Sequence, residues 1–144
     1  MAQPHIFRGS CHCGGIAVEL AFTMDAAALQ VRACQCGFCT RQGAVTVSDP
    51  AGRARFSIAT GRLTTYQFET RTATSLICSR CGVYAGVVLR DGHDAWSVAN
   101  VRGLAVPEFN GRPGEPSHYE HETAAERIAR RKRRWTPTEF DFTL

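Results

Sequence analysis

The sequence is 144 residues long, which is the length of one ordinary globular domain. Apolar residues make up 44 % of it and charged residues 21 %, close to the averages of folded proteins, so a disordered, collagen-like or coiled-coil chain is excluded. The net charge of +4 does not predict a broad nucleic-acid-binding face, because six of the 17 basic side chains lie in residues 127–134 and residues 1–126 carry eleven basic and eleven acidic ones.

Short β-strands dominate the predicted secondary structure. Runs of β-branched, aromatic and alternating apolar residues, separated by glycine, proline and aspartate, are typical of strands joined by turns. The sequence predicts six or seven such strands and a short turn over residues 26–31. The predicted strands span residues 15–22, 43–47, 54–59, 62–68, 73–77, 83–89 and 95–101. We therefore expect an all-β fold built of short antiparallel strands.

The C-terminal part of the chain has a different character. Residues 103–118 contain too many proline and glycine residues for a regular element, so they predict a loop. Thr123 and Glu126 have the spacing of a capping box and predict one short helix over residues 124–134, which ends before Thr136-Pro137. This helix carries the basic run.

The sequence contains neither a membrane segment nor a secretion signal. No stretch approaches the roughly 18 consecutive apolar residues of a membrane-spanning helix. Residues 1–10 lack the basic and then apolar pattern of a secretory signal. We therefore expect a cytoplasmic protein with no membrane partner.

The seven cysteines carry the strongest functional signal. A reducing compartment disfavours disulfides, and an odd number of cysteines cannot pair completely. Cysteines two or three positions apart are typical of metal ligands, because their thiolates can converge on one ion about 2.3 Å away. The cysteines form three such clusters: Cys11-x-Cys13, Cys34-x-Cys36-x-x-Cys39 and Cys78-x-x-Cys81.

Two of the clusters together supply four thiolates. Gly82 follows Cys78 and Cys81 and lets the chain turn tightly, so that both sulfurs can face one metal ion. Cys11 and Cys13 form the nearest plausible second half of this site. A closed four-cysteine zinc site leaves no position for a substrate, so we predict a structural role. Four ordinary buried cysteines are the less favoured alternative.

The remaining cluster has three cysteines, and three protein ligands are typical of a catalytic zinc site. Cys34, Cys36 and Cys39 would leave a fourth position open for water or substrate. The alternative is that His12 or a nearby carboxylate closes the site and makes it structural. The ligand count favours the open site.

The order of these motifs resembles the glutathione-dependent formaldehyde-activating enzyme family, which includes centromere protein V. The similar region spans about residues 9–106, and residues 107–144 add the C-terminal loop and basic helix to one zinc-binding domain over 1–144. Seven cysteines in this order are a highly specific signal. The matching segments are Gly9-Ser10-Cys11-His12-Cys13-Gly14-Gly15, the cysteine triplet, residues 61–66 (GRLTTY) and Cys78-x-x-Cys81-Gly82.

The resemblance implies a fold, two metal ions and an activity. It implies an all-β "β-tent" fold that holds two zinc ions per chain. The implied activity is that of a carbon–sulfur lyase, which joins or parts glutathione, or another thiol, and a small aldehyde such as formaldehyde. The implied ligands are Cys11, Cys13, Cys78 and Cys81 for a structural zinc, and Cys34, Cys36 and Cys39 for a catalytic one.

Other residues are candidates for substrate contacts. Arg32 and Arg41 flank the triplet and could pair with the carboxylates of a glutathione-like substrate, although a solvated arginine is the slightly favoured alternative. The reaction also needs a proton carrier, which the sequence does not single out. The candidates by residue type are His12, His93, His118 and His121, each of which also fits an ordinary surface histidine.

Two other functions compete with the lyase. A binding module held together by zinc would contact nucleic acid or protein through the helix at 124–134, but a solvated helix that docks through Ile128 and Trp135 is favoured, so a nucleic-acid partner is not expected. A methionine-sulfoxide-reductase-like enzyme would need a reactive cysteine without a metal, and all seven cysteines are already assigned.

Overall fold

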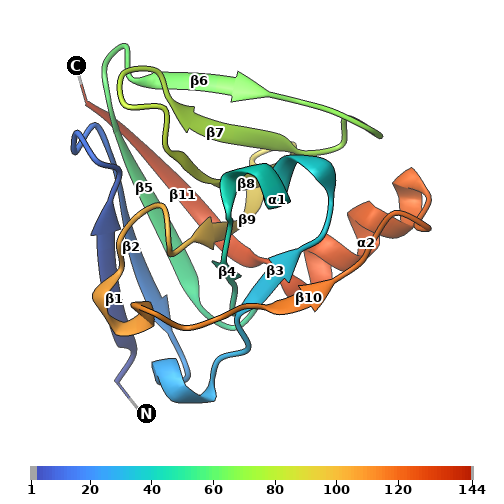
Figure 1. Ribbon diagram of the computed structural model, residues 1–144, viewed down its shortest axis with the longest axis horizontal. Coiled ribbons are helices and arrows are strands. Elements are labelled where there is room, and N and C mark those ends of the chain that lie inside the picture. The colour runs from blue at the N-terminus through green and yellow to red at the C-terminus, as the bar shows by residue number, and fades with distance from the viewer. Residues whose placement is uncertain (1–2, 144) are drawn as a thin grey trace.

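The structure is a computed structural model that describes residues 3–143 (Figure 1). It contains eleven strands, two α-helices and two short 3-10 helices. The α-helices are α1 (Gly37–Gln42) and α2 (Ala124–Arg134), and the 3-10 helices are η1 (Ala26–Ala28) and η2 (Pro107–Phe109). The strands are β1 (His5–Ser10), β2 (Ile16–Phe22), β3 (Arg32–Cys34), β4 (Thr46–Val47), β5 (Arg53–Ala59), β6 (Leu63–Tyr66), β7 (Thr74–Cys78), β8 (Tyr84–Asp91), β9 (Asp94–Asn100), β10 (Glu115–Ser117) and β11 (Thr136–Thr143).

The first sheet has the order β1-β2-β5-β11. β1, β2 and β5 are antiparallel neighbours, whereas β11 is parallel to β5. Buried and half-buried residues alternate strictly along β2, because one face of the strand packs on the core. This alternation is the pattern that made β2 predictable.

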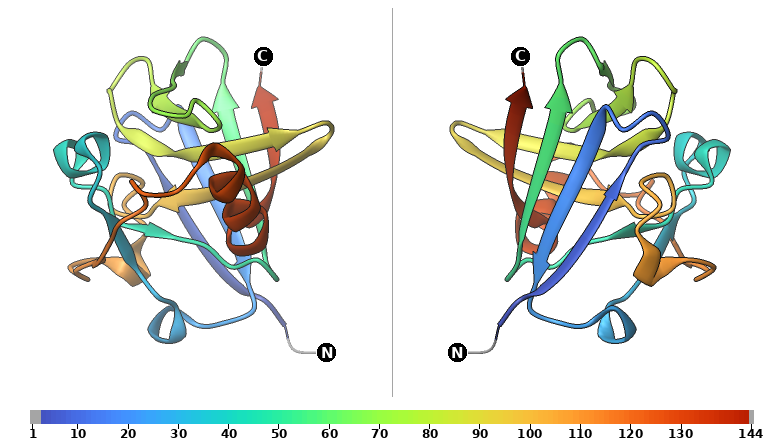
Figure 2. Two further views of the ribbon diagram at one scale, coloured as in Figure 1. Left: turned by 90° about the vertical axis from the view of Figure 1, so that its right-hand side faces the viewer. Right: turned by 90° about the vertical axis from the view of Figure 1, so that its left-hand side faces the viewer.

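The second sheet is arranged around β9. β6, β7 and β8 follow one another on one side of β9 as an antiparallel meander. β4 and the start of β11 pair with its other side, and β3 and β10 extend the sheet from β4. β11 therefore belongs to both sheets. The strands of the second sheet run across those of the first (Figure 2), which is the β-tent arrangement that the resemblance implies.

The main core fills the space between the sheets. Phe22, Phe56, Ile16 and Ile58 are each at most 2 % exposed. The Phe7 ring packs edge to face on the rings of Phe22 and Phe109, with centroid distances of 5.9 and 5.4 Å.

The predicted all-β fold with a C-terminal helix is confirmed. Thr123 caps α2, and Glu126 completes the capping box. Ile128 and Trp135 pack against Leu89 and Val98, and the prediction that the helix docks through these two residues is confirmed. α2 therefore lies on the outside of β8 and β9 (Figure 2).

Four strands and one helix were not predicted. They are β1, β3, β10, β11 and α1. The loop predicted over 103–118 contains η2 and β10, and the turn predicted over 26–31 contains η1. α1 forms within the cysteine triplet, where the sequence predicts neither a helix nor a strand. Neither α1 nor α2 has the length and apolar character needed to cross a lipid bilayer.

Candidate metal centre and adjoining cavity

The four cysteines of the larger set come together at one end of the two sheets. Cys11 and Cys13 lie in the turn between β1 and β2, Cys78 ends β7, and Cys81 lies in the turn before β8. The Cys13 sulfur is 3.8 Å from that of Cys11 and 3.4 Å from that of Cys78, and all four sulfurs lie within 4.8 Å of one another. Sulfurs at the corners of a tetrahedron around zinc are about 3.8 Å apart. The set therefore fits a metal ion.

Hydrogen-bond donors around these four cysteines favour the deprotonated thiolate form over the neutral thiol. The Ile16 backbone N–H donates to the Cys11 sulfur at 3.2 Å, and Arg62 Nη1 lies 3.5 Å from the Cys13 sulfur. Burial nevertheless raises the pKa of Cys11 to about 11. A cation among four sulfurs would favour the charged form of Cys11 and oppose this effect.

The three-cysteine set is built by a strand end and a helix start. Cys34 ends β3, Cys36 caps the N-terminus of α1, and Cys39 lies in the first turn of that helix. The Cys39 backbone N–H donates to the Cys36 sulfur at 3.3 Å. Hydrogen bonds from Cys34 and Cys39 hold the pKa of Cys36 well below its ordinary value. These hydrogen bonds thus favour the thiolate form of Cys36 within the set.

The three sulfurs lie within 4.8 Å of one another. Within residues 3–143, no further Cys, His, Asp or Glu ligand atom belongs to this group. His12, the candidate to close the site, lies instead in the exposed turn between Cys11 and Cys13. The arrangement favours the open site over the closed one.

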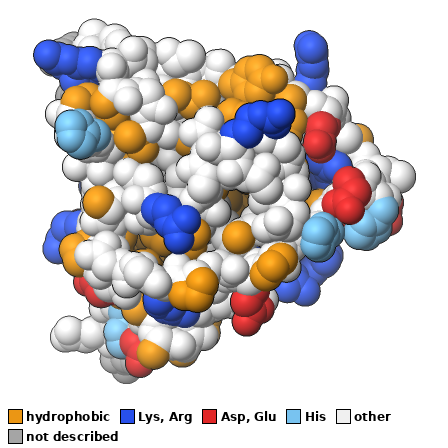
Figure 3. Space-filling model, viewed as in Figure 1, with side chains coloured by type: hydrophobic (Ala, Val, Ile, Leu, Met, Phe, Trp, Pro, Cys, Tyr) orange, Lys and Arg blue, Asp and Glu red, His pale blue; other side chains and the backbone are white. Residues whose placement is uncertain are grey.

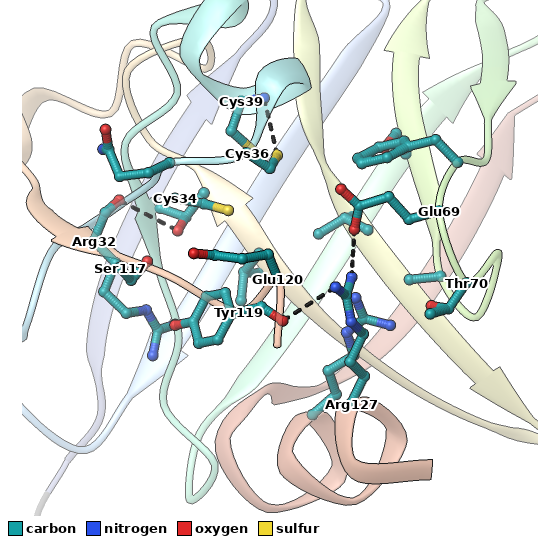
Figure 4. A pocket seen from close by; sticks show the side chains of 18 of the residues that line it. Arg32, Cys34, Cys36, Cys39, Glu69, Thr70, Ser117, Tyr119, Glu120 and Arg127 are labelled. Atoms are coloured by element: carbon teal, nitrogen blue, oxygen red, sulfur yellow. Dashed lines mark hydrogen bonds and ion pairs between the residues drawn. The ribbon is translucent and has the colours of Figure 1, made fainter. Parts of the chain in front are cut away.

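A cavity of about 370 Å³ adjoins the three cysteines (Figure 4). This volume is in the range of small-molecule sites. Its walls come from the triplet with the start of α1, from the β6–β7 loop, from the last residue of β10 and the three residues after it, and from α2. Its apolar lining includes Phe68, Ala73, Tyr84, Val87, Val98 and Trp135.

Aromatic rings pack beside the triplet. The Phe38 ring on α1 contacts those of Tyr66, Phe68 and Tyr84 at centroid distances of 5.5, 5.2 and 5.0 Å. Tyr84 is buried, and its burial together with the nearby cysteine sulfurs raises the pKa of its hydroxyl well above the ordinary value. The Tyr84 hydroxyl therefore keeps its proton next to the cysteine triplet.

The basic helix turns three arginines toward the cavity. Arg127, Arg130 and Arg131 line it, and Arg127 is only 8 % exposed. The predicted helix docks through Ile128 and Trp135 as expected, but these three arginines line the cavity, so the helix is less solvated than predicted. Their spacing of three and four positions places them on one helix face, a signal that the sequence itself contains.

The three remaining basic residues of α2 do not line the cavity. Lys132 pairs with Asp91, and Arg133 and Arg134 are exposed. On the face shown in Figure 3, Lys and Arg side chains lie apart, and acidic and histidine side chains gather at the right-hand edge.

The remaining candidates separate into two groups. Arg32 and His118 line the cavity. Arg32 is half-buried, which lowers the pKa of its guanidinium, and its Nη2 donates to Ser48 Oγ at 2.6 Å. Arg41 is exposed and donates to the Gly37 carbonyl. Four of the candidates are absent from the residues that line the cavity: His12, Arg41, His93 and His121.

The fold and the site define a small all-β protein with two cysteine clusters that could hold metal ions. Residues 6–104 match the family described as glutathione-dependent formaldehyde-activating enzyme, and the chain belongs to this family. The family-like region expected over residues 9–106 closely overlaps this match.

A solved structure supports the same fold. A crystal structure of a Rhodobacter sphaeroides protein, a Northeast Structural Genomics target, is similar with 31 % sequence identity and a TM-score of 0.58. The similarity covers 76 % of this chain and 99 % of that one. A comparison with curated proteins finds no match.

Proposed function

We propose that this protein is a zinc-dependent carbon–sulfur lyase that acts on the adduct of a thiol and a small aldehyde, with S-hydroxymethylglutathione as the reference substrate. The observation that carries the proposal is the three-cysteine set, which faces a small-molecule cavity and lacks a fourth protein ligand among the described residues. Family membership supports glutathione and formaldehyde chemistry. Seven free thiols suit the reducing cytoplasm.

We assign one zinc ion to each cysteine set. Cys11, Cys13, Cys78 and Cys81 would hold a structural ion, since four thiolates complete its coordination. The catalytic ion would be held by Cys34, Cys36 and Cys39. When bound there, zinc would supply a Lewis acid that stabilises the thiolate of the substrate.

The reaction has a simple balance. The carbon–sulfur bond breaks and its electron pair goes to sulfur, while the hydroxyl of the adduct loses a proton and becomes the aldehyde carbonyl. We assign the acceptance of this proton to His118, the candidate histidine that lines the cavity, and its Nδ1 lies 3.8 Å from Glu120 Oε1. Phe68 and Val87 add apolar side chains to the lining of the cavity.

Zinc analysis and a formaldehyde-release assay test the proposal. We expect two zinc ions per chain, one per chain in Cys36→Ser, and turnover of S-hydroxymethylglutathione in the parent protein only. His118→Gln should lower kcat and keep both zinc ions, because it removes a proton acceptor and no ligand. His93→Gln, in the exposed β8–β9 turn, is the matched control and should behave like the parent protein.

Two results would contradict the proposal. One is a fully metal-loaded protein that turns over neither this adduct nor adducts of other thiols. The other is a triplet cysteine that reacts with alkylating reagents even when both zinc sites are fully occupied, since the proposal assigns all three thiolates to the ion.

A further inference from the structure

The C-terminal segment adds a charged wall to the cavity. Family similarity ends at residue 104, and α2 begins twenty residues later, at Ala124. Arg127 of α2 lies across the cavity from the three cysteines (Figure 4), and Arg131 follows one helical turn later on the same face. This chain therefore places guanidinium groups opposite its candidate metal centre.

Two of the three inward arginines are neutralised by acidic partners. Arg127 Nη1 lies 2.6 Å from Glu69 Oε2, and Arg130 Nε lies 3.0 Å from Glu122 Oε2. Arg131 forms no ion pair with any residue from 3 to 143. Of the three, Arg131 is thus the one with an uncompensated charge.

Arg131 is held in place by neutral groups. Its Nη1 donates to Thr72 Oγ1 at 2.6 Å, and its guanidinium lies 5.0 Å from the centroid of the Trp135 ring. Burial, followed by the neighbouring Arg130 and Arg127 charges, lowers the pKa of Arg131 to about 10. Arg131 therefore remains charged near neutral pH, in a half-buried position where a charge without a partner is costly.

Three polar atoms around the cavity lack hydrogen-bond partners. They are Ser117 Oγ, Arg127 Nε and Arg131 Nε, which are buried and unpaired within the described part of the chain. All three residues line the cavity. Because at least nine in ten buried polar groups in proteins are hydrogen-bonded, these orphan atoms indicate a ligand that carries acceptor atoms.

We infer that Arg131, supported by Arg127, binds a carboxylate of the thiol substrate on the side of the cavity opposite the three cysteines. A guanidinium fork matches the two oxygens of a carboxylate. A carboxylate fits this side of the cavity better than a doubly charged phosphate, because Glu69 and Glu122 already neutralise Arg127 and Arg130 and leave one uncompensated charge among the three inward arginines of α2. The inference rests on the proposed function for the thiol end of the ligand only.

Calorimetric binding to the zinc-loaded protein tests the subsite. Two matched pairs serve as probes, S-methylglutathione with its diethyl ester and 6-mercaptohexanoate with 6-mercaptohexanol. We expect the parent protein to bind at least one carboxylate member about tenfold or more tightly than its neutral match. Arg131→Gln keeps a donor for Thr72 and removes the charge, so it should abolish this preference. Arg133→Gln, on the exposed side of α2, should retain the preference.

The experiment separates this inference from the proposed function. S-methylglutathione carries the carboxylates but no thiol, so its preference over the ester should survive in Cys36→Ser even if no adduct is ever turned over. A carboxylate preference without turnover would contradict the proposed lyase activity and would support the carboxylate subsite. Turnover without the preference, or a preference unchanged in Arg131→Gln, would overturn the subsite. A lack of binding by all four probes would overturn it as well.

Discussion

At the residue scale, the burial of Arg127 requires an explanation. Moving a charged side chain out of water is costly unless partners replace the lost hydration. Arg127 obtains these partners from two loops, since it pairs with Glu69 in the β6–β7 loop and Nη2 donates to the Tyr119 carbonyl at 3.1 Å. One arginine thus joins α2 to both loops that border the cavity.

Removal of the acidic partner should therefore destabilise the protein. We expect Glu69→Gln to lower the free energy of unfolding by about 1–2 kcal/mol, because Arg127 stays buried without its counter-charge. The figure is below that of a fully buried pair, since the Glu69 side chain is 41 % exposed. Urea denaturation would measure the change.

An exposed ion pair in the same protein provides the control. Arg8 and Glu19 pair across β1 and β2 with side chains that are 71 and 45 % exposed. Glu19→Gln should change the free energy of unfolding by less than about 0.5 kcal/mol. Equal effects of the Glu19 and Glu69 substitutions would show that the burial of Arg127 does not strengthen its pair.

The cysteines of the site could be predicted from sequence, whereas the arginines could not be assigned by charge alone. Ligand spacing within Cys34, Cys36 and Cys39 is local, so the chain itself brings these sulfurs together. The position of Arg127 depends on Glu69, which lies 58 residues earlier and reaches it only in the folded protein. A basic run is usually solvated, and tertiary contacts overrode that expectation here.

At the element scale, the start of α2 fixes the position of its arginines. Thr123 Oγ1 accepts from the Glu126 backbone N–H at 3.1 Å, and Glu126 Oε1 accepts from the Thr123 N–H at 2.9 Å. Thr123→Ala should lower the free energy of unfolding by about 1 kcal/mol, because it removes the N-cap acceptor. Thr123→Ser keeps the hydroxyl and should have the stability of the parent protein. Thermal melting of both variants measures the difference. A Thr123→Ala variant with the same melting temperature as Thr123→Ser would contradict the role of the cap.

The same cap predicts a pH dependence. The hydrogen bonds from Thr123 lower the pKa of Glu126 below its ordinary value of 4.5. The carboxylate therefore stabilises the folded state above that value, and this contribution is lost as the pH falls through the lowered pKa. The stability difference between the parent protein and Glu126→Gln should shrink on going from neutral pH to about pH 3, since effects common to both proteins cancel. A difference that stays constant over this range would contradict the prediction.

The strands that were not predicted carry weak local signals. β1 has a single buried residue, Phe7, because it forms an edge of the first sheet. β11 begins at Thr136-Pro137, which is typical of a helix end, and the strand is stabilised by its parallel pairing with β5 some 80 residues earlier. α1 is only six residues long and begins with Gly37, so propensity does not indicate a helix there. These elements form through pairing and capping that only the complete fold supplies.

At the scale of the whole molecule, the four-cysteine set connects the two sheets. Cys11 and Cys13 follow a strand of the first sheet, while Cys78 and Cys81 border the meander of the second, more than sixty residues later. β11 joins the sheets elsewhere through Thr136-Pro137 and the segment after it. A metal ion at the four cysteines would thus hold together regions that no local interaction brings into contact.

Loss of the two metal sites should have different consequences for folding. Cys81→Ser should prevent a cooperative melt near the parent temperature, because apparent binding energies of structural zinc, about 10–16 kcal/mol, match or exceed typical domain stabilities of about 5–15 kcal/mol. Cys36→Ser should fold and lose activity, since its cluster lies within β3 and α1 and joins no distant strands. Thermal melting by circular dichroism, with zinc analysis of each variant, measures the difference. Equal unfolding of both variants would show that the second site is structural as well, and a normal melt of Cys81→Ser would show that the first site does not stabilise the fold.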